Sequence, residues 1–289
     1  MVTGVTGDGR GLPHPLTGQL FDSPVPAGTG WPEDLATART PVCTDRTEVV
    51  RRASAAAELT QIDAESSVCR ACPRLVDWRE AVAVEKRRSF ASEPYWGRPV
   101  TGWGDESPRV VVLGLAPAAH GGNRTGRIFT GDRSGDWLFA SLHRVGLAAR
   151  AESLHAGDGQ RLIGTRMIAS VRCAPPDNRP TIEERDTCSA WLDAELRLVL
   201  PAVRAVVCLG LFAWEAMLRA ATRHGYAVPR PRPRFGHGAR VQLPASEGSA
   251  RPLVVLGCYH PSQQNTFTGK LTEPMLDAVL GEAARLAYA

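Results

Sequence analysis

Four short runs of apolar residues lie between residue 110 and the C-terminal region, and segments with helical spacing separate them. The runs lie at 110–115, 167–171, 205–209 and 253–256. They are rich in β-branched residues and too short for buried helices, which favours strands. Because the runs are apolar throughout rather than alternating, we expect central strands of a parallel sheet that is covered on both faces.

Apolar residues with helical spacing lie between and after these runs, at about 136–145, 181–200, 212–223 and from 273 onward. The second segment has a clear start, because Thr181 is followed three residues later by Glu184, the spacing of a capping box. Strands that alternate with helices imply right-handed crossovers. The pattern therefore predicts the α/β class, a three-layer α/β/α fold with a central four-stranded parallel sheet.

The remainder of the chain is less regular. Helical spacing recurs over 48–66 and 78–90, whereas residues 1–48 hold many Gly, Pro and Thr residues and little apolar periodicity. We expect a flexible N-terminal segment over 1–48 and one folded domain over 49–289. The Pro- and Arg-rich stretch 224–251 predicts a long exposed loop or a hairpin.

Composition and charge narrow the class of protein only slightly. No stretch reaches the ~18 consecutive apolar residues of a membrane span, and the N-terminus lacks a secretory pattern, so we expect a cytoplasmic protein without a membrane partner. The net charge is +4, and the 34 basic residues include only two lysines, Lys86 and Lys270. Arginine suits bidentate phosphate contacts, but a GC-rich genome would produce the same bias.

Four of the seven cysteines have a spacing that suits metal chemistry. A Cys-x2-Cys turn at Cys69 and Cys72 presents two thiolates, and Cys173 after a strand and Cys188 early in a helix would supply two more. The spacing leaves four interpretations open: an iron–sulfur site, a four-cysteine zinc site, independent buried thiols, or a redox pair. The redox pair is disfavoured because the Cys-x2-Cys turn does not open a βα unit.

The other three cysteines lie outside this group. Cys208 and Cys258 lie in or after apolar strands, so we expect them in the core. Cys43 falls in the N-terminal segment and is expected to be exposed.

Two polar loops follow apolar runs, 114–123 after the first run and 257–265 after the last. In open parallel sheets, ligands bind just outside the carboxyl ends of the strands. We therefore expect the two loops to form two ends of one site, with His260 as a candidate functional residue. Taken alone, a histidine before a proline at such a place is equally well a packed or surface residue.

Three longer stretches carry a family resemblance. Residues 114–132 (GLAPAAHGGNRTGRIFTGD) and 260–272 (HPSQQNTFTGKLT) closely resemble the two signature motifs of uracil-DNA glycosylases of the type-B, family 5 branch. Residues 172–180 (RCAPPDNRP) match the segment that lies between those motifs in the family. The resemblance covers about residues 50–289.

The resemblance implies a DNA-repair enzyme that flips a damaged base out of the stack and hydrolyses its N-glycosidic bond, leaving an abasic site. The implied substrates are uracil and other altered bases, such as hypoxanthine and ethenocytosine, in double- or single-stranded DNA. It also implies a 4Fe-4S cluster on Cys69, Cys72, Cys173 and Cys188. We expect a nucleoid-associated monomer. The sequence does not decide whether a sliding clamp is a partner. The alternative is a non-catalytic iron–sulfur module that binds nucleic acid.

The resemblance implies roles for residues of the two loops. Phe129 matches the phenylalanine that stacks on the base, and His260 matches the histidine that donates to a base oxygen as charge develops. Where other glycosylase families place an acid, the base-contacting loop of this chain has Ala118. Asn123 and Asp132 are then the candidates to orient the water or the sugar, with Asp132 equally suited to cap the following helix.

Further contacts to the base and the duplex are expected around these loops. Ser170 or Asn178 would read the base edge. A wedge for the gap in the duplex would come from Gln263, Gln264, Phe267 or Leu271. The side chains expected to meet phosphates are Arg124, Arg127 and Lys270. Because Lys270 is the only lysine in the signature stretches, we expect a monofunctional glycosylase without Schiff-base lyase chemistry.

Overall fold

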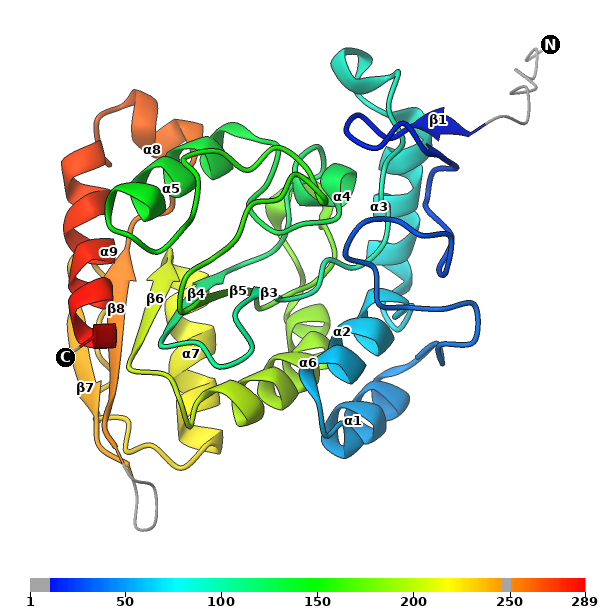
Figure 1. The fold of residues 1–289 in the computed structure, drawn as a ribbon. Helices are drawn as coiled ribbons and strands as arrows, with labels where there is room; N and C mark the ends of the chain where they lie inside the picture. Colours follow the sequence, from blue (N-terminus) through cyan, green and yellow to red (C-terminus); the bar gives the residue numbers. More distant parts are fainter. Residues whose placement is uncertain (1–10, 246–250, 289) are drawn as a thin grey trace.

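A six-stranded mixed sheet with helices on both faces forms the centre of the protein (Figure 1). The computed structural model describes residues 11–245 and 251–288. The strand order is β3-β5-β4-β6-β8-β7. The four inner strands run parallel and are β5 (Thr165–Ala169), β4 (Val110–Gly114), β6 (Ala205–Leu209) and β8 (Leu253–Cys258).

Two antiparallel edge strands complete the sheet, β3 (Trp103–Gly104) beside β5 and β7 (Arg240–Leu243) beside β8. The α/β class, the three layers and the four central parallel strands are confirmed, and the two antiparallel edge strands extend the sheet to six. The β3 strand is only two residues long, too short for any periodicity. The β7 strand is largely exposed and forms a hairpin with β8 inside the stretch expected to be a loop or a hairpin.

Side chains of the inner strands alternate between two cores, one on each face of the sheet. Along β4, Val110 and Val112 pack in one core, and Val111 and Leu113 pack in the other. The first core is covered by α5 (Arg133–Arg144) and α9 (Glu273–Tyr288). The second is covered by α6 (Ile182–Val199), α7 (Leu211–Arg223), α1 (Arg46–Ala55) and α2 (Leu59–Ser67).

Helix boundaries follow local capping where the sequence encodes it and tertiary contacts where it does not. The capping box of Thr181 and Glu184 is present at the start of α6. The single helix expected over 48–66 is instead two helices. Arg197 of α6 donates to the carbonyl oxygens of Ser54 and Ala56, which satisfies the end of α1 and stops it there. None of the described helices combines the length and the apolar character needed to cross a membrane.

Several short elements connect these layers. The helical segment expected over 78–90 is displaced, because α3 begins earlier, at a proline in its first turn, and a separate 3-10 turn follows it. The remaining elements are β1 (Leu12–Pro13), β2 (Leu20–Phe21), α3 (Pro73–Glu85), η1 (Arg88–Phe90), α4 (Gly122–Thr125), η2 (Pro176–Asn178) and α8 (Gln263–Phe267).

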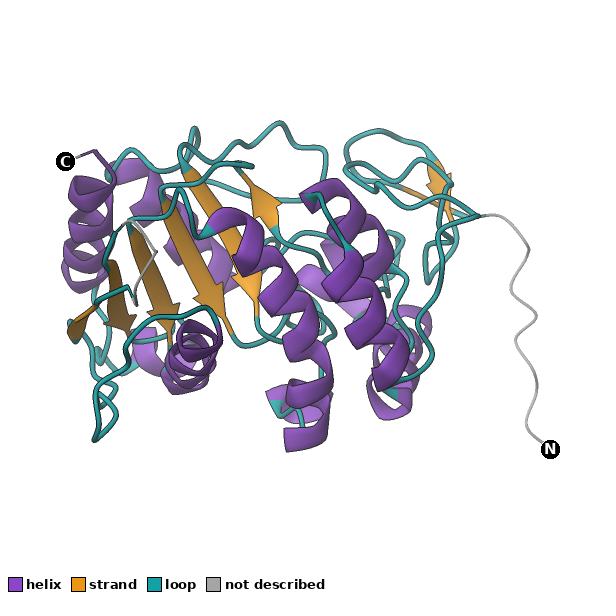
Figure 2. Cartoon of the chain, turned by 90° about the horizontal axis from the view of Figure 1, so that it is seen from below, coloured by secondary structure: helices purple, strands orange, loops and turns teal. Residues whose placement is uncertain are grey.

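The N-terminal segment packs against the domain over residues 11–45, so the expectation of a flexible segment over 1–48 is wrong for that part; residues 1–10 lie outside the described residues. The β1–β2 hairpin lies at the opposite end of the molecule from α9 (Figure 2). Trp31 is 2% exposed and packs against Phe21 and Trp96. Cys43, expected to be exposed, is fully buried beside α1 and α6. A few large side chains thus anchor a segment that lacks periodicity.

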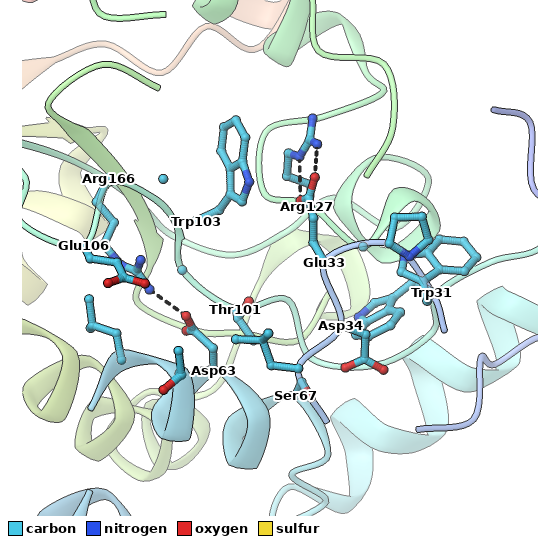
Figure 3. A pocket seen from close by; sticks show the side chains of 18 residues that line it. Trp31, Glu33, Asp34, Asp63, Ser67, Thr101, Trp103, Glu106, Arg127 and Arg166 are labelled. Atoms are coloured by element: carbon cyan, nitrogen blue, oxygen red, sulfur yellow. Dashed lines mark hydrogen bonds and ion pairs between the residues drawn. The ribbon is translucent and has the colours of Figure 1, made fainter. Parts of the chain in front are cut away.

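Ion pairs also hold this segment in place. A cavity of about 290 Å³ lies between residues 31–35, α2 and β3 (Figure 3). At its rim, Glu33 forms a bidentate pair with Arg127, as the dashed lines in Figure 3 mark. Behind it, Asp34 forms a second bidentate pair with Arg98. The segment therefore supplies counter-charges to buried arginines of the domain.

We predict that the N-terminal segment unfolds together with the rest of the domain. Trp31→Ala should lower the free energy of unfolding by about 3–5 kcal/mol, because it removes a fully buried aromatic side chain. Leu35→Ala, at a side chain that is 51% exposed in the same segment, should lower it by less than about 1 kcal/mol. Urea unfolding followed by circular dichroism measures both values; equal, small effects would contradict the packing.

Candidate active site

The two polar loops meet at the carboxyl end of the sheet, where β4, β6 and β8 lie side by side. Gly114 ends β4, and His260 follows β8. Gly210, which follows β6 between them, has a φ of 94°, and its Cα faces the Cβ of His260. Its N–H also donates to the carbonyl oxygen of Cys258 at 2.9 Å. Because Gly210 has no side chain, His260 packs against the end of β6 and its ring faces the loop that follows β4.

Phe129 lies against the other side of this site. A Cβ on Gly114 would be only 2.5 Å from Cζ of Phe129, so the ring rests directly on the backbone at the end of β4. The ring centroids of Phe129 and His260 are 6.1 Å apart, with the planes tilted by 38°. Phe129 adopts a φ of 52°, in the left-handed region that non-glycine residues rarely occupy. Two residues 131 positions apart in the chain thus face each other across the strand ends.

The electrostatics of His260 follow from its burial. Burial lowers the pKa of His260 to about 4. The imidazole is therefore neutral at pH 7, with one N–H donor and one acceptor nitrogen. The side chain of Asn265 donates to the carbonyl oxygen of His260 at 2.8 Å and holds the loop that follows β8. A neutral donor is thus fixed next to the Phe129 ring.

Asp132 has one oxygen committed to the fold. Its Oδ1 accepts from the N–H of Gly135 at 2.9 Å, so Asp132 is the N-cap of α5. Its Oδ2 points toward Gly121, where a Cβ would be 2.2 Å from that oxygen and 3.3 Å from Cβ of Ala118. Burial raises the pKa of the Asp132 carboxyl above its ordinary value. The Asp132 carboxylate therefore lies near Ala118, the position where other glycosylase families place an acid.

Asn123 is fully buried beneath the β4 loop. Its backbone N–H donates to the carbonyl oxygen of Ala118 at 3.1 Å, and its Nδ2 donates to the carbonyl oxygen of Arg79 at 3.1 Å. Its Oδ1 has no hydrogen-bond partner within the described part of the chain. These bonds attach the loop to α3.

A cleft of about 570 Å³ opens beside the loops. Asp132 and Gln263 line it, and so do four residues that the sequence did not single out, which are Arg87, Phe90, His120 and Arg133. No sequence signal pointed to Arg87 or Phe90, because they follow α3 in an irregular stretch. His120 and Arg133 lie inside or beside the signature stretch, so the resemblance could have found them.

Two of the three side chains expected to meet phosphates are engaged inside the protein. Arg124 is buried and bonds to Glu93 at 2.9 Å, and its guanidinium also donates to backbone carbonyls. Arg127 is 1% exposed and is held by Glu33 and Asp158. Carboxylates already pair with both guanidinium groups, which disfavours the expected phosphate contacts, although Arg124 lines the cleft. Lys270 is exposed, with its ammonium 4.9 Å from the centre of the Tyr259 ring.

The two residues expected to read the base edge lie elsewhere. Gly114 pairs with Ala169 in the parallel register of β4 and β5, so Ser170 faces the opposite side of the sheet from Phe129. It lines a small cavity with residues of α6 and α7. Asn178 is exposed at the end of η2, outside the residues that line the cleft. The hydroxyl of Ser170 donates to the carbonyl oxygen of Leu115 at 2.9 Å and is thus engaged in the fold.

The four wedge candidates differ in exposure. Leu271 is fully buried in the core under α9, so it is excluded as a wedge. Gln263, Gln264 and Phe267 are exposed on α8, and Phe267 is 65% exposed. The guanidinium of Arg133 lies 4.7 Å from the centre of the Phe267 ring. The side chains of α8 therefore stand beside the cleft.

The four spaced cysteines surround one small apolar space, together with Leu75, Val76 and Trp191. Arg79, almost fully buried, donates to Sγ of Cys173 at 2.8 Å, and the N–H of Arg172 donates to Sγ of Cys188 at 3.3 Å. Burial and the neighbouring Cys173 raise the pKa of the Cys72 thiol to about 12. All four thiols are free, while Cys208 and Cys258 lie in the core as expected.

Within the described residues, no group of three or more His, Cys, Asp or Glu side chains is arranged to hold a metal ion. The donors that face Cys173 and Cys188 are those that stabilise negative charge on sulfur.

Comparison with known proteins relates the chain to one family. The model of the uracil DNA glycosylase superfamily matches residues 101–284. A type-5 uracil-DNA glycosylase of Mycobacterium bovis is 57% identical over 274 residues, covering 95% of this chain and 98% of the relative. A type-5 uracil-DNA glycosylase of Thermus thermophilus is 50% identical over 221 residues, covering 76% and 94%. One from Pyrobaculum aerophilum is 46% identical over 222 residues, covering 75% and 88%.

The two tasks of Asp132, capping and presenting charge, can be separated by substitution. Asp132→Asn should keep the free energy of unfolding within about 0.5 kcal/mol, because asparagine caps helices as well as aspartate does. Asp132→Ala should cost about 1 kcal/mol, because the N–H of Gly135 loses its acceptor. Urea unfolding of the three proteins tests this; an asparagine variant as unstable as the alanine variant would contradict it.

Proposed function

The chain belongs to the uracil-DNA glycosylase superfamily, and we propose that it hydrolyses the N-glycosidic bond of uracil in DNA and leaves an abasic site. The observation that carries the proposal is the pairing of Phe129 with His260 across the strand ends, at 6.1 Å between ring centroids. An aromatic face and a neutral donor at one point are what a flipped pyrimidine needs. The partner is DNA, double- or single-stranded. The proposed working unit is a monomer.

The departing base acquires negative charge as the bond to the sugar breaks. With the base stacked on Phe129, the N–H of His260 donates to a carbonyl oxygen of the base and stabilises the charge where it develops. A neutral imidazole is suited to this, because its proton is fixed before the reaction and no charge has to be desolvated. The pKa of about 4 supports this form of His260 over the working pH range.

Water attacks the sugar from the side of the β4 loop. Asp132 Oδ2, whose neighbour Oδ1 is held by Gly135, orients the water and accepts its proton as the new C–O bond forms at the sugar. The electrons of the broken C–N bond leave with the base, which is later protonated by solvent. The approach of Asp132 and Ala118 to the same point beside Gly121 supports Asp132 as the replacement for the acid that Ala118 lacks. Asn123 touches no reacting group in this mechanism; it positions the β4 loop by attaching it to α3.

The same geometry supports a broader substrate range. Because the Ser170 hydroxyl is bonded to the Leu115 carbonyl oxygen and Asn178 is exposed at the end of η2, backbone groups of the β4 loop are left to contact the base edge. Backbone contacts around an aromatic face discriminate less than a dedicated side-chain amide does. The proposal therefore includes hypoxanthine and ethenocytosine as further substrates. The proposal keeps hydrolysis without Schiff-base chemistry, because Lys270 is exposed and its ammonium lies against the Tyr259 ring.

The donor set of the cysteine site fits a 4Fe-4S cluster. Cys69, Cys72, Cys173 and Cys188 would each hold one iron, and the cluster would tie the start of α3 to the loop after β5 and to α6. The guanidinium of Arg79 and the N–H of Arg172 would stabilise the negative charge of the sulfurs. Such a cluster uses one thiolate per iron, which matches the number of cysteines around the space.

His260→Ala should lower the single-turnover rate of uracil release from a duplex by about 100- to 1000-fold, because the donor to the departing base is lost. Asp132→Asn should lower it by about 100-fold or more while the fold is kept. Alkali cleavage of a labelled strand measures the product. The wild-type rate should not fall as pH rises through 6.5, the ordinary pKa of histidine, because His260 is already neutral there. Tight binding without product in the wild type would favour the non-catalytic alternative.

The protein purified without oxygen should show the visible absorbance of an iron–sulfur cluster, with four iron and four sulfide per chain. Cys69→Ala should abolish both, because one thiolate ligand is lost. Cys208→Ala is the matched control: that cysteine is buried in the core away from the site and should leave the absorbance unchanged. A colourless wild-type protein that holds one zinc per chain would contradict the cluster.

A further inference from the structure

We propose that the tip of the β1–β2 hairpin, Pro15 and Leu16, is a second DNA-contacting element that holds the damaged strand against the cleft. The inference rests on the proposed function, because it takes DNA as the occupant of the cleft. It assigns a substrate-binding task to a segment outside the residues matched by the family model, which begin at residue 101.

The hairpin tip forms one wall of the cleft that contains Asp132. Pro15 and Leu16 line the cleft together with Arg133 and Gln263, which come from α5 and α8. In Figure 1, the hairpin and α8 lie along the same edge of the molecule as the carboxyl ends of the strands. The cleft, at about 570 Å³, is lined by Asp132 but not by Phe129 or His260, so it lies beside the pair of rings and is open to other nucleotides of the same strand.

The lining of the cleft fits a nucleic-acid strand. Arg87 and Arg133 are exposed there, and within the described residues neither lies within 4.0 Å of a carboxylate oxygen. Of the acidic residues of the lining, Glu93 is paired with Arg124, and Asp136 lies near Arg133. Apolar surface lies between them: Leu16 is 46% exposed, Leu154 is 53% exposed, and the Phe90 ring is partly buried. Guanidinium groups interleaved with apolar and aromatic side chains are the pattern with which proteins bind a strand by its phosphates and base faces.

The tip is held rigidly in this position. His14, 1% exposed, accepts at Nδ1 from the N–H groups of Leu16 and Thr17, each at 3.3 Å. Its ring packs edge-on against Trp31 and His155, with centroids 4.8 Å and 4.3 Å away. Burial lowers the pKa of His14, which keeps Nδ1 available as the acceptor for the turn. A contact made by a preorganised turn costs little ordering entropy when DNA binds.

The hairpin offers its own control residue. Leu20 lies on β2, two residues from the turn, and is 59% exposed, but it does not line the cleft. Leu16→Asp and Leu20→Asp add the same charge to the same hairpin and remove the same exposed side chain. Neither change touches a buried contact, so the two variants should unfold at the same urea concentration as the wild type. A difference in DNA binding between them therefore reports on the cleft wall alone.

The experiment measures each full-length protein twice. With uracil-containing duplex and single strand, Leu16→Asp should raise KM about tenfold and leave kcat within about twofold, because the contact is remote from the reacting bond. Leu20→Asp should change KM by less than about twofold. Fluorescence anisotropy with undamaged duplex should show a matching tenfold loss of affinity for Leu16→Asp only.

The two proposals fail separately. A wild-type protein that binds duplex but releases no uracil would overturn the glycosylase function, while the anisotropy comparison would still test the hairpin. If the wild type releases uracil and Leu16→Asp matches Leu20→Asp in both KM and affinity, the hairpin tip is not a DNA contact. A loss in kcat with KM unchanged would likewise overturn it, because the effect would then lie in the chemical step.

Discussion

The ring of Phe129 rests on the backbone of Gly114, and the site depends on that contact. A second glycine holds the same residue from the other side, because a Cβ on Gly135 would be 2.1 Å from the carbonyl oxygen of Phe129. With the ring fixed between β4 and the first turn of α5, the chain must reverse over residues 115–132. That reversal brings Asp132 to the start of α5 and its free oxygen to Gly121. One close approach thus sets both the aromatic face and the carboxylate.

The arginines of the loop serve this geometry. Arg124 and Arg127 are buried, and each is paired with carboxylates from distant segments. A buried guanidinium without such partners would be strongly unfavourable, so the pairs specify where Glu33, Glu93 and Asp158 must lie. Glu33 belongs to the N-terminal segment. The positive charge of the signature stretch therefore organises the fold, and the exposed cations of the cleft come from Arg87 and Arg133.

The cysteine site is linked to the same loop by two hydrogen bonds. Arg79 donates to Sγ of Cys173 through its side chain and accepts from Asn123 through its carbonyl oxygen. Arg79 thus connects α3, the loop after β5 and the β4 loop. The cysteine site is thereby tied to the loop that carries Asn123.

The amino-acid sequence predicted those features that a short stretch of residues encodes. Apolar runs located the four parallel strands, the spacing of Thr181 and Glu184 located the start of α6, and two strand-end loops located the site with Phe129 and His260. Tertiary structure alone decided which side chains are free. Alternation across β5 put Ser170 on the face of the sheet opposite to Phe129, carboxylates far away in the chain engaged Arg124 and Arg127, and a few buried aromatic residues fixed an N-terminal segment without periodicity. Each of these outcomes depends on contacts between residues distant in sequence, which no local pattern records.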